Sequence, residues 1–223
     1  MKTKRKTILA VSVGILIIVL SSTAVFSNIP SSTKADELAR VACLGDSITQ
    51  FTGYPADLQK LLGNSSSVGN FGVSGATVNF DSAVPYYYEP AFRHAKAFEP
   101  TTVIIMLGTN DARNDTFQKV GSFVADYDRM IKSLQAQKIS PQIFLVEPPP
   151  IYNNTLGLNS TDFAQGIIPR IQEVASQLGL PIINVYTPLQ NHPEDFMDGV
   201  HPNSAGAQEI ANIIYEALES YST

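Results

Sequence analysis

Short apolar runs alternate with longer amphipathic stretches from residue 36 onward. We predict strands at the apolar runs, which are residues 40–44, 67–71, 102–107, 142–146 and 181–185. We predict helices at the amphipathic stretches, which are residues 54–62, 91–98, 120–137, 161–178 and 204–221. Strands that are apolar on both faces and alternate with helices are typical of a parallel sheet covered on both sides. The pattern therefore predicts one α/β domain over residues 36–223, a three-layer α/β/α sandwich around five parallel strands.

Polar segments follow four of the predicted strands. In chain order they read GDS (45–47), NFGVSG (70–75), GTND (108–111) and DGVHPN (198–203). In open parallel sheets the ligand crevice lies beyond the carboxyl ends of the strands. We therefore expect these four segments to gather at one edge of the sheet and to form the functional site.

Three side chains in these segments could act together in nucleophilic catalysis. A serine hydroxyl needs an adjacent base, and that base needs a partner that fixes its tautomer. Ser47 can supply the hydroxyl, His201 the base and Asp198 the partner, because Asp198 precedes His201 in one short loop.

Ester hydrolysis also needs hydrogen-bond donors at the developing oxyanion. The backbone amides of Ser47 and Gly75 and the side-chain amide of Asn110 are the candidates. Each feature also has a structural interpretation, since a serine after Gly-Asp can cap a helix and Asp198-Gly199 can form a turn. That interpretation requires a coincidence at four separate sheet-edge segments, so the pattern favours catalysis.

Composition and spacing argue against several other classes of site. The net charge of −5 leaves no basic patch for nucleic acid. The one cysteine, Cys43, lies in an apolar run, so we predict a small buried residue and not a reactive thiol. The three histidines lack the spacing of a zinc-binding helix, so we expect no metal. No Gly-x-Gly-x-x-Gly follows a strand, so we expect no dinucleotide cofactor.

The four segments, with GDSIT (45–49) as the first, resemble in order and separation the sequence blocks of the SGNH hydrolases, also called the GDSL esterase/lipase family. The resemblance covers residues 39 to about 220. It implies a flavodoxin-like sheet of five parallel strands and an enzyme without a metal or cofactor. It also implies site roles: Ser47 as nucleophile, His201 as base, Asp198 as its partner, and Ser47, Gly75 and Asn110 as oxyanion donors.

The finer pattern resembles a bacterial branch of sialate O-acetylesterase-like and acetylxylan-esterase-like proteins. This implies removal of acetyl groups from a small-molecule or glycan ester through an acyl-enzyme. Three consecutive tyrosines, residues 86–88, could offer ring faces to a sugar or pack together in a surface loop. Two alternatives stay open, namely a lipase, lysophospholipase or thioesterase of the same superfamily, and an inactive surface module that binds glycans.

The first 35 residues differ in kind from the rest. A basic start is followed by an uncharged apolar run over residues 8–26 and then by small and polar residues. This order predicts a secretory signal, with a cleavage site before Asp36. The same run is close to the length that spans a bilayer, so it could instead remain as a membrane tether. Either interpretation exports the domain.

Overall fold

The computed structural model describes residues 38–222. The predicted leader, residues 1–35, and its apolar run at 8–26 lie outside the described residues. Within the described part of the chain, no helix combines the length and the apolar character that crossing a membrane would require.

The sheet has five strands, all parallel, in the order β2-β1-β3-β4-β5. Their bounds are β1 Ala39–Gly45, β2 Ser66–Gly72, β3 Thr102–Met106, β4 Gln142–Glu147 and β5 Ile182–Asn184. All five predicted strands are therefore confirmed, with ends that differ by at most one residue. The strand order reverses at β1, which lies between β2 and β3. The crevice of such a sheet opens at this point, beyond the carboxyl ends of β1 and β3.

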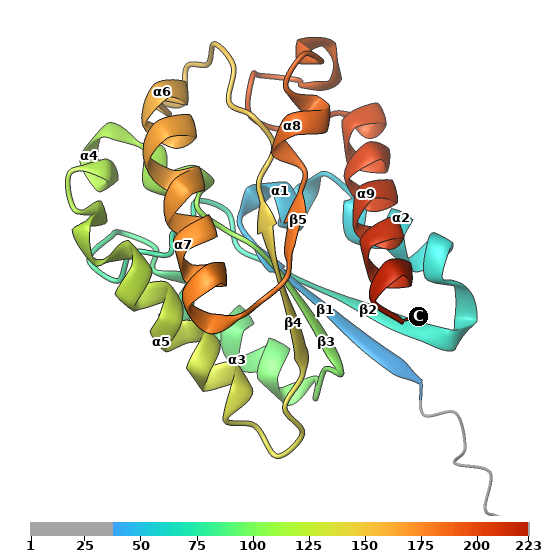
Figure 1. Cartoon of the computed structure of the whole chain (residues 1–223). Helices are drawn as coiled ribbons and strands as arrows, with labels where there is room; N and C mark the ends of the chain where they lie inside the picture. Colours follow the sequence, from blue (N-terminus) through green and yellow to red (C-terminus); the bar gives the residue numbers. More distant parts are fainter. Residues whose placement is uncertain (1–37, 223) are drawn as a thin grey trace, which may run out of the picture. The chain divides into compact units, whose positions relative to one another are not determined.

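Helices cover both faces of the sheet, which confirms the three-layer architecture (Figure 1). One face packs against α2 Tyr54–Leu62 and α9 Ser204–Ser222. The other face packs against α3 Pro90–Ala97, α5 Phe123–Gln135 and α7 Ile168–Leu178. The remaining helices are short: α1 Ser47–Phe51, α4 Asn114–Phe117, α6 Ser160–Asp162 and α8 Tyr186–Leu189. Turns of 3-10 helix lie at Gly63–Ser65, Tyr86–Tyr88, Thr109–Ala112, Val120–Ser122 and Pro193–Asp195.

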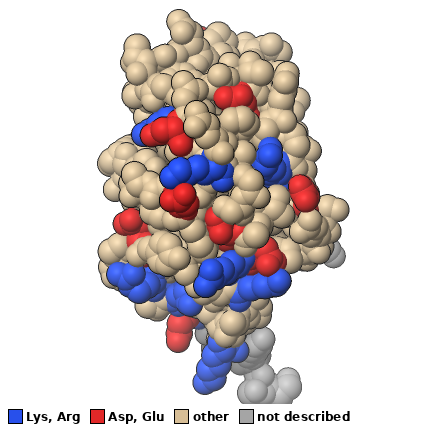
Figure 2. Space-filling view, turned by 90° about the vertical axis from the view of Figure 1, so that its left-hand side faces the viewer, with Lys and Arg blue, Asp and Glu red and all other residues tan. Residues whose placement is uncertain are grey.

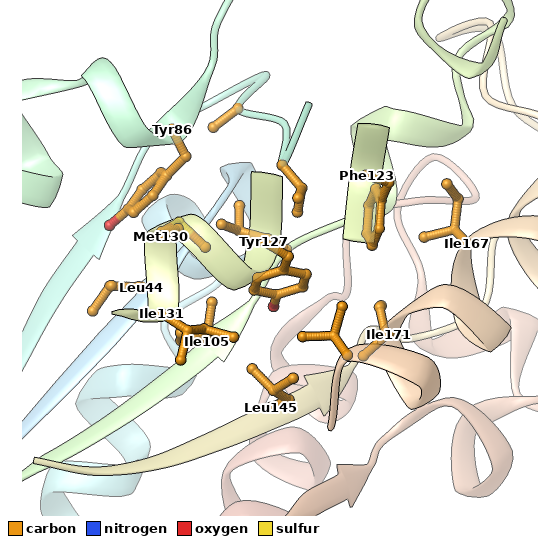
Figure 3. Packing of buried hydrophobic residues seen from close by; sticks show 14 of the residues in the cluster. Leu44, Tyr86, Ile105, Phe123, Tyr127, Met130, Ile131, Leu145, Ile167 and Ile171 are labelled. Carbon is orange, nitrogen blue, oxygen red and sulfur yellow. The ribbon is translucent and has the colours of Figure 1, made fainter. Parts of the chain in front are cut away.

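A hydrophobic core lies on each face of the sheet, and the side chains of successive residues in each central strand enter the two cores alternately. In β1, Leu44 enters the core under α5 and α7, whereas Cys43 enters the core under α2 and α9. Figure 3 shows the first core, where Tyr127 of α5 and Ile171 of α7 lie over the aliphatic side chains of the sheet. Burial raises the pKa of the Cys43 thiol to about 12, which keeps it protonated. The prediction that Cys43 is a small buried residue is confirmed.

The helix predicted over 161–178 contains an irregularity. It begins as α6, passes through a π-helical turn at Phe163–Ile167 and continues as α7. Pro169 lies in the first turn of α7 and has no N–H to donate to a carbonyl one turn earlier. The hydrogen-bonding pattern thus changes from π to α beside this proline.

Candidate active site

Ser47 lies where β1 turns abruptly into α1. The carboxylate of Asp46 caps this helix by accepting a hydrogen bond from the Ile48 N–H at 2.9 Å. The cap is therefore Asp46, which leaves the Ser47 hydroxyl available for other contacts. The turn requires glycine at position 45, because a Cβ there would lie 2.0 Å from Thr49 Oγ1. A close turn thus brings the serine to the strand end with only 8% of its surface exposed.

His201 joins the predicted nucleophile to the predicted carboxylate. Its Nε2 lies 2.8 Å from Ser47 Oγ, and its Nδ1 lies 2.7 Å from Asp198 Oδ2. An ionised carboxylate only accepts hydrogen bonds, so Nδ1 carries the proton and Nε2 is free to accept the serine proton. The structure thus brings these three residues together, although Ser47 and His201 are 154 positions apart in the sequence.

The loop that carries Asp198 and His201 is held by its own hydrogen bonds. Asp198 Oδ1 accepts from the backbone N–H groups of Val200 at 3.0 Å and His201 at 2.8 Å. Partial burial raises the pKa of the Asp198 carboxyl, but the hydrogen bonds from His201 and Val200 outweigh it, and the pKa lies below its ordinary value. Asp198 is consequently ionised at neutral pH, as a partner for the imidazole must be.

Two backbone amides near Ser47 have no hydrogen-bond acceptor among the described residues. They are the N–H groups of Ser47, at the start of α1, and of Gly75, in the turn after β2. Gly75 has φ of +77°, a conformation that costs little only for glycine. The neighbouring Ser74 N–H is bound by Gln50 Oε1 at 2.7 Å, which fixes this turn beside α1. Both amides are thus candidates to bind an oxyanion.

Asn110, the third predicted donor, faces the same pocket from the turn after β3. Its Nδ2 donates to the Ala76 carbonyl at 3.1 Å and lies 3.4 Å from Asp46 Oδ2. The second contact is long for a hydrogen bond, so the N–H on that side is only weakly engaged and is the candidate donor to a substrate oxyanion. All the predicted site residues therefore lie at one sheet edge.

A cavity of about 290 Å³ opens at these residues. Its wall is formed by Ser47, Ser74, Gly75, Asn110, Arg113, Leu156, Leu158, Val200 and His201. The sequence patterns did not identify Arg113, Leu156 or Leu158. Arg113 comes three residues after Asn110, a proximity that could have marked it, whereas no local motif marks the two leucines.

Comparison with known proteins gives the same family from the sequence. Residues 43–209 match the model of the GDSL-like lipase/acylhydrolase family, so the match includes every predicted site residue. The chain belongs to this family.

Two proteins that are similar to this chain in sequence are esterases. An acetylxylan esterase from Xylanibacter ruminicola is 37% identical over 210 residues, which cover 82% of this chain and 44% of that protein. A multidomain esterase from Ruminococcus flavefaciens is 24% identical over 135 residues, or 57% of this chain and 17% of that protein. The chain thus spans less than half the length of both relatives.

Solved structures share the fold at lower identity. A carbohydrate acetylesterase from Sinorhizobium meliloti superposes with a TM-score of 0.67 at 15% identity, covering 82% of this chain and 99% of that one. An inhibitor-bound aryl esterase from M. smegmatis gives a TM-score of 0.65 at 19% identity, with the same two coverages. These likenesses confirm the three-layer fold of the family.

Two carboxyl groups of this GDSL-family chain are buried beside the site. Asp111 accepts hydrogen bonds from the N–H groups of Val78 at 2.9 Å and Asn79 at 3.0 Å, which ties the loop after Gly75 to the end of β3. Burial raises the pKa of Asp111 to about 7, although these two hydrogen bonds lower it. Burial likewise raises the pKa of Asp46 to about 6. Both side chains order loops through hydrogen bonds to backbone N–H groups.

These two pKa values give a stability prediction. Between pH 4 and pH 7 the folded chain binds more protons than the unfolded chain, so the free energy of unfolding should fall as pH rises through this window. Asp111→Asn removes the larger contribution. Between pH 5 and pH 8, the free energy of unfolding of this variant, measured by urea unfolding, should fall by about 2–3 kcal/mol less than that of the wild type. Asp128→Asn on the surface is the matched control, and an equal decline in both variants would contradict the assignment.

Two other groups of residues lie outside the cavity. His192, Glu194 and Asp195 could each offer one metal ligand, with the ligand atoms within 4.8 Å of one another. His192 Nδ1 already lies 3.1 Å from Glu194 Oε1, and both side chains are exposed. The tyrosines at 86–88 pack on neighbouring rings, with Phe80 stacked on Tyr87 at 4.8 Å between centroids. None of these residues lines the cavity beside Ser47.

Proposed function

We propose that this chain is a serine esterase in which Ser47 is the nucleophile, His201 the general base and Asp198 the partner that orients the base. The observation that carries the proposal is the continuous chain of two short contacts, Ser47 Oγ to His201 Nε2 at 2.8 Å and His201 Nδ1 to Asp198 Oδ2 at 2.7 Å. Contacts of this length allow direct proton transfer between serine and imidazole.

The reaction that follows has two halves. Ser47 Oγ attacks the ester carbonyl carbon while His201 Nε2 takes the hydroxyl proton, and the carbonyl oxygen becomes an oxyanion. The amides of Ser47, Gly75 and Asn110 bind that oxyanion. The tetrahedral intermediate then expels the alkoxide, which takes the proton from Nε2 and leaves as an alcohol. Water repeats the sequence on the acyl-enzyme and releases the carboxylic acid.

We further propose that the acyl group is short, chiefly acetyl, and that its carrier is a carbohydrate. The cavity of about 290 Å³ lies near the lower end of the range for small-molecule sites, and Leu156, Leu158 and Val200 bound it. The 37% identical relative is an acetylxylan esterase, which supports the same substrate class. An acetylated polysaccharide needs to place only one acetyl group inside the cavity at a time.

An acyl-chain series tests this proposal. We expect kcat/KM for 4-nitrophenyl esters to fall at least about tenfold from acetate to octanoate, because a longer chain exceeds the cavity. Acetylated xylo-oligosaccharides should release acetate, as measured by NMR. A maximum at octanoate would favour the lipase or thioesterase alternative. Glycan affinity without any turnover would favour the binding module.

Export of the domain is also a proposal. Residues 1–35 carry the sequence order of a secretory signal or a membrane tether. N-terminal sequencing of the mature protein distinguishes them, because a cleaved signal leaves a chain that begins near Asp36 and a tether leaves the apolar run in place.

A further inference from the structure

In the part of the chain that the structure describes, Arg113 is the one lysine or arginine that lines the cavity beside Ser47. Its backbone is held firmly, because it pairs with Leu158 in an antiparallel bridge and its N–H donates to the Asn110 carbonyl at 3.3 Å. Leu158 and Asn110 are themselves part of the cavity wall. The backbone of Arg113 is therefore held by two residues that also form the cavity wall.

The guanidinium of Arg113 is poorly satisfied. Its Nη2 lies 3.4 Å from Asn110 Oδ1, which is long for a hydrogen bond. Its Nε–H is buried and has no acceptor among the described residues. No carboxylate of the described residues forms an ion pair with Arg113. The cavity wall contains no acidic side chain either.

Three lysines among the described residues are paired with carboxylates on the surface. Lys60, Lys119 and Lys132 form ion pairs with aspartates at 2.7, 3.1 and 2.8 Å. Figure 2 shows lysine and arginine side chains interspersed with acidic ones across one face of the molecule. Arg113 therefore stands out as a fixed cation at the site whose hydrogen-bonding capacity remains largely unused.

We propose that Arg113 makes this esterase selective for substrates that carry a carboxylate group near the scissile ester. A guanidinium presents a planar fork of N–H donors that binds a carboxylate through two parallel hydrogen bonds. A neutral acetylated sugar leaves the Nη donors of Arg113 to water, whereas a sugar acid or a dicarboxylic acyl group pairs with them. This inference rests on the proposed esterase function and specifies its substrate class.

Two substrate pairs test the proposal and locate the carboxylate. The first pair is an O-acetylated methyl glucuronoside and the matching O-acetylated methyl glucoside, which differ in a carboxylate on the carrier. The second pair is monomethyl succinate and methyl butyrate, which differ in a carboxylate on the acyl group. We expect kcat/KM to favour the anionic member of one pair by roughly 10- to 100-fold, mainly through KM. The preference should weaken as ionic strength rises.

Variants assign the preference to the guanidinium. Arg113→Gln should reduce the ratio of anionic to neutral kcat/KM to about one, and Arg113→Lys should retain part of it. Arg93→Gln, which removes a positive charge from α3 outside the cavity, should leave the ratio at its wild-type value. Titration calorimetry of the glucuronoside into Ser47→Ala gives binding without turnover, and adding Arg113→Gln should weaken it by the same factor.

Equal kcat/KM within both pairs for the wild-type chain would overturn the inference, as would a preference that survives Arg113→Gln. Either result leaves the esterase proposal intact if neutral acetyl esters are still hydrolysed. Absence of hydrolysis of every ester tested would instead overturn the proposed function itself.

Discussion

Replacing Ser47 by alanine is expected to lower kcat for 4-nitrophenyl acetate by at least about 10⁴-fold. Among the described residues, the Ser47 hydroxyl is the only group within hydrogen-bond distance of His201 Nε2, so its loss leaves the imidazole with no nucleophile to activate. The oxyanion donors and the cavity remain and supply only the residual acceleration. The melting temperature should change by no more than a few degrees, because the helix cap is Asp46 and not Ser47.

Ser74→Ala is the matched control for this experiment. Ser74 lines the same cavity and is followed directly by Gly75, but the hydrogen bonds of the His201 ring go to Ser47 and Asp198 and not to Ser74. We expect at most a tenfold loss of kcat. If Ser47→Ala retained activity comparable to that of Ser74→Ala, another nucleophile would have to be sought and the proposed mechanism would be wrong.

The sheet and its helices could be predicted because their signals are local. The run Thr102–Met106 is apolar at nearly every position, and such a run fits only a strand buried on both faces. Once parallel strands are assumed, the rule that sites form beyond their carboxyl ends places Ser47, Asn110 and His201 together without any distance being known.

The cavity wall could not be predicted in the same way. Arg113 meets Leu158 through a bridge between two irregular segments that are 45 residues apart, and no periodic pattern encodes such a pairing. The loop after Gly75 depends similarly on Asp111, whose carboxylate accepts hydrogen bonds from the N–H groups of Val78 and Asn79 across a separation of more than 30 residues. Motifs thus identify the reacting groups, whereas long-range contacts between loops shape the space in front of them.

Replacing Asp198 by asparagine is expected to lower kcat/KM by about 10²- to 10⁴-fold. The amide can keep accepting from the Val200 and His201 N–H groups through Oδ1, so the loop should remain in place. Its Nδ2 would then face His201 Nδ1 and donate to it. The imidazole would have to carry its proton on Nε2, where it could no longer accept the proton of Ser47.

The exposure of Asp198 sets where in this range the effect falls. Its side chain is 42% exposed, so water can partly replace the carboxylate and stabilise the imidazolium ion that forms during the reaction. We therefore expect a loss toward the lower end, nearer 10²-fold, measured as kcat/KM for 4-nitrophenyl acetate. Asp195→Asn removes a charge from the same loop without touching His201, and it should cost less than about threefold. A comparable loss in both variants would mean that Asp198 acts through its charge at a distance, whereas a loss confined to Asp198→Asn identifies the hydrogen bond at Nδ1 as the source of the effect.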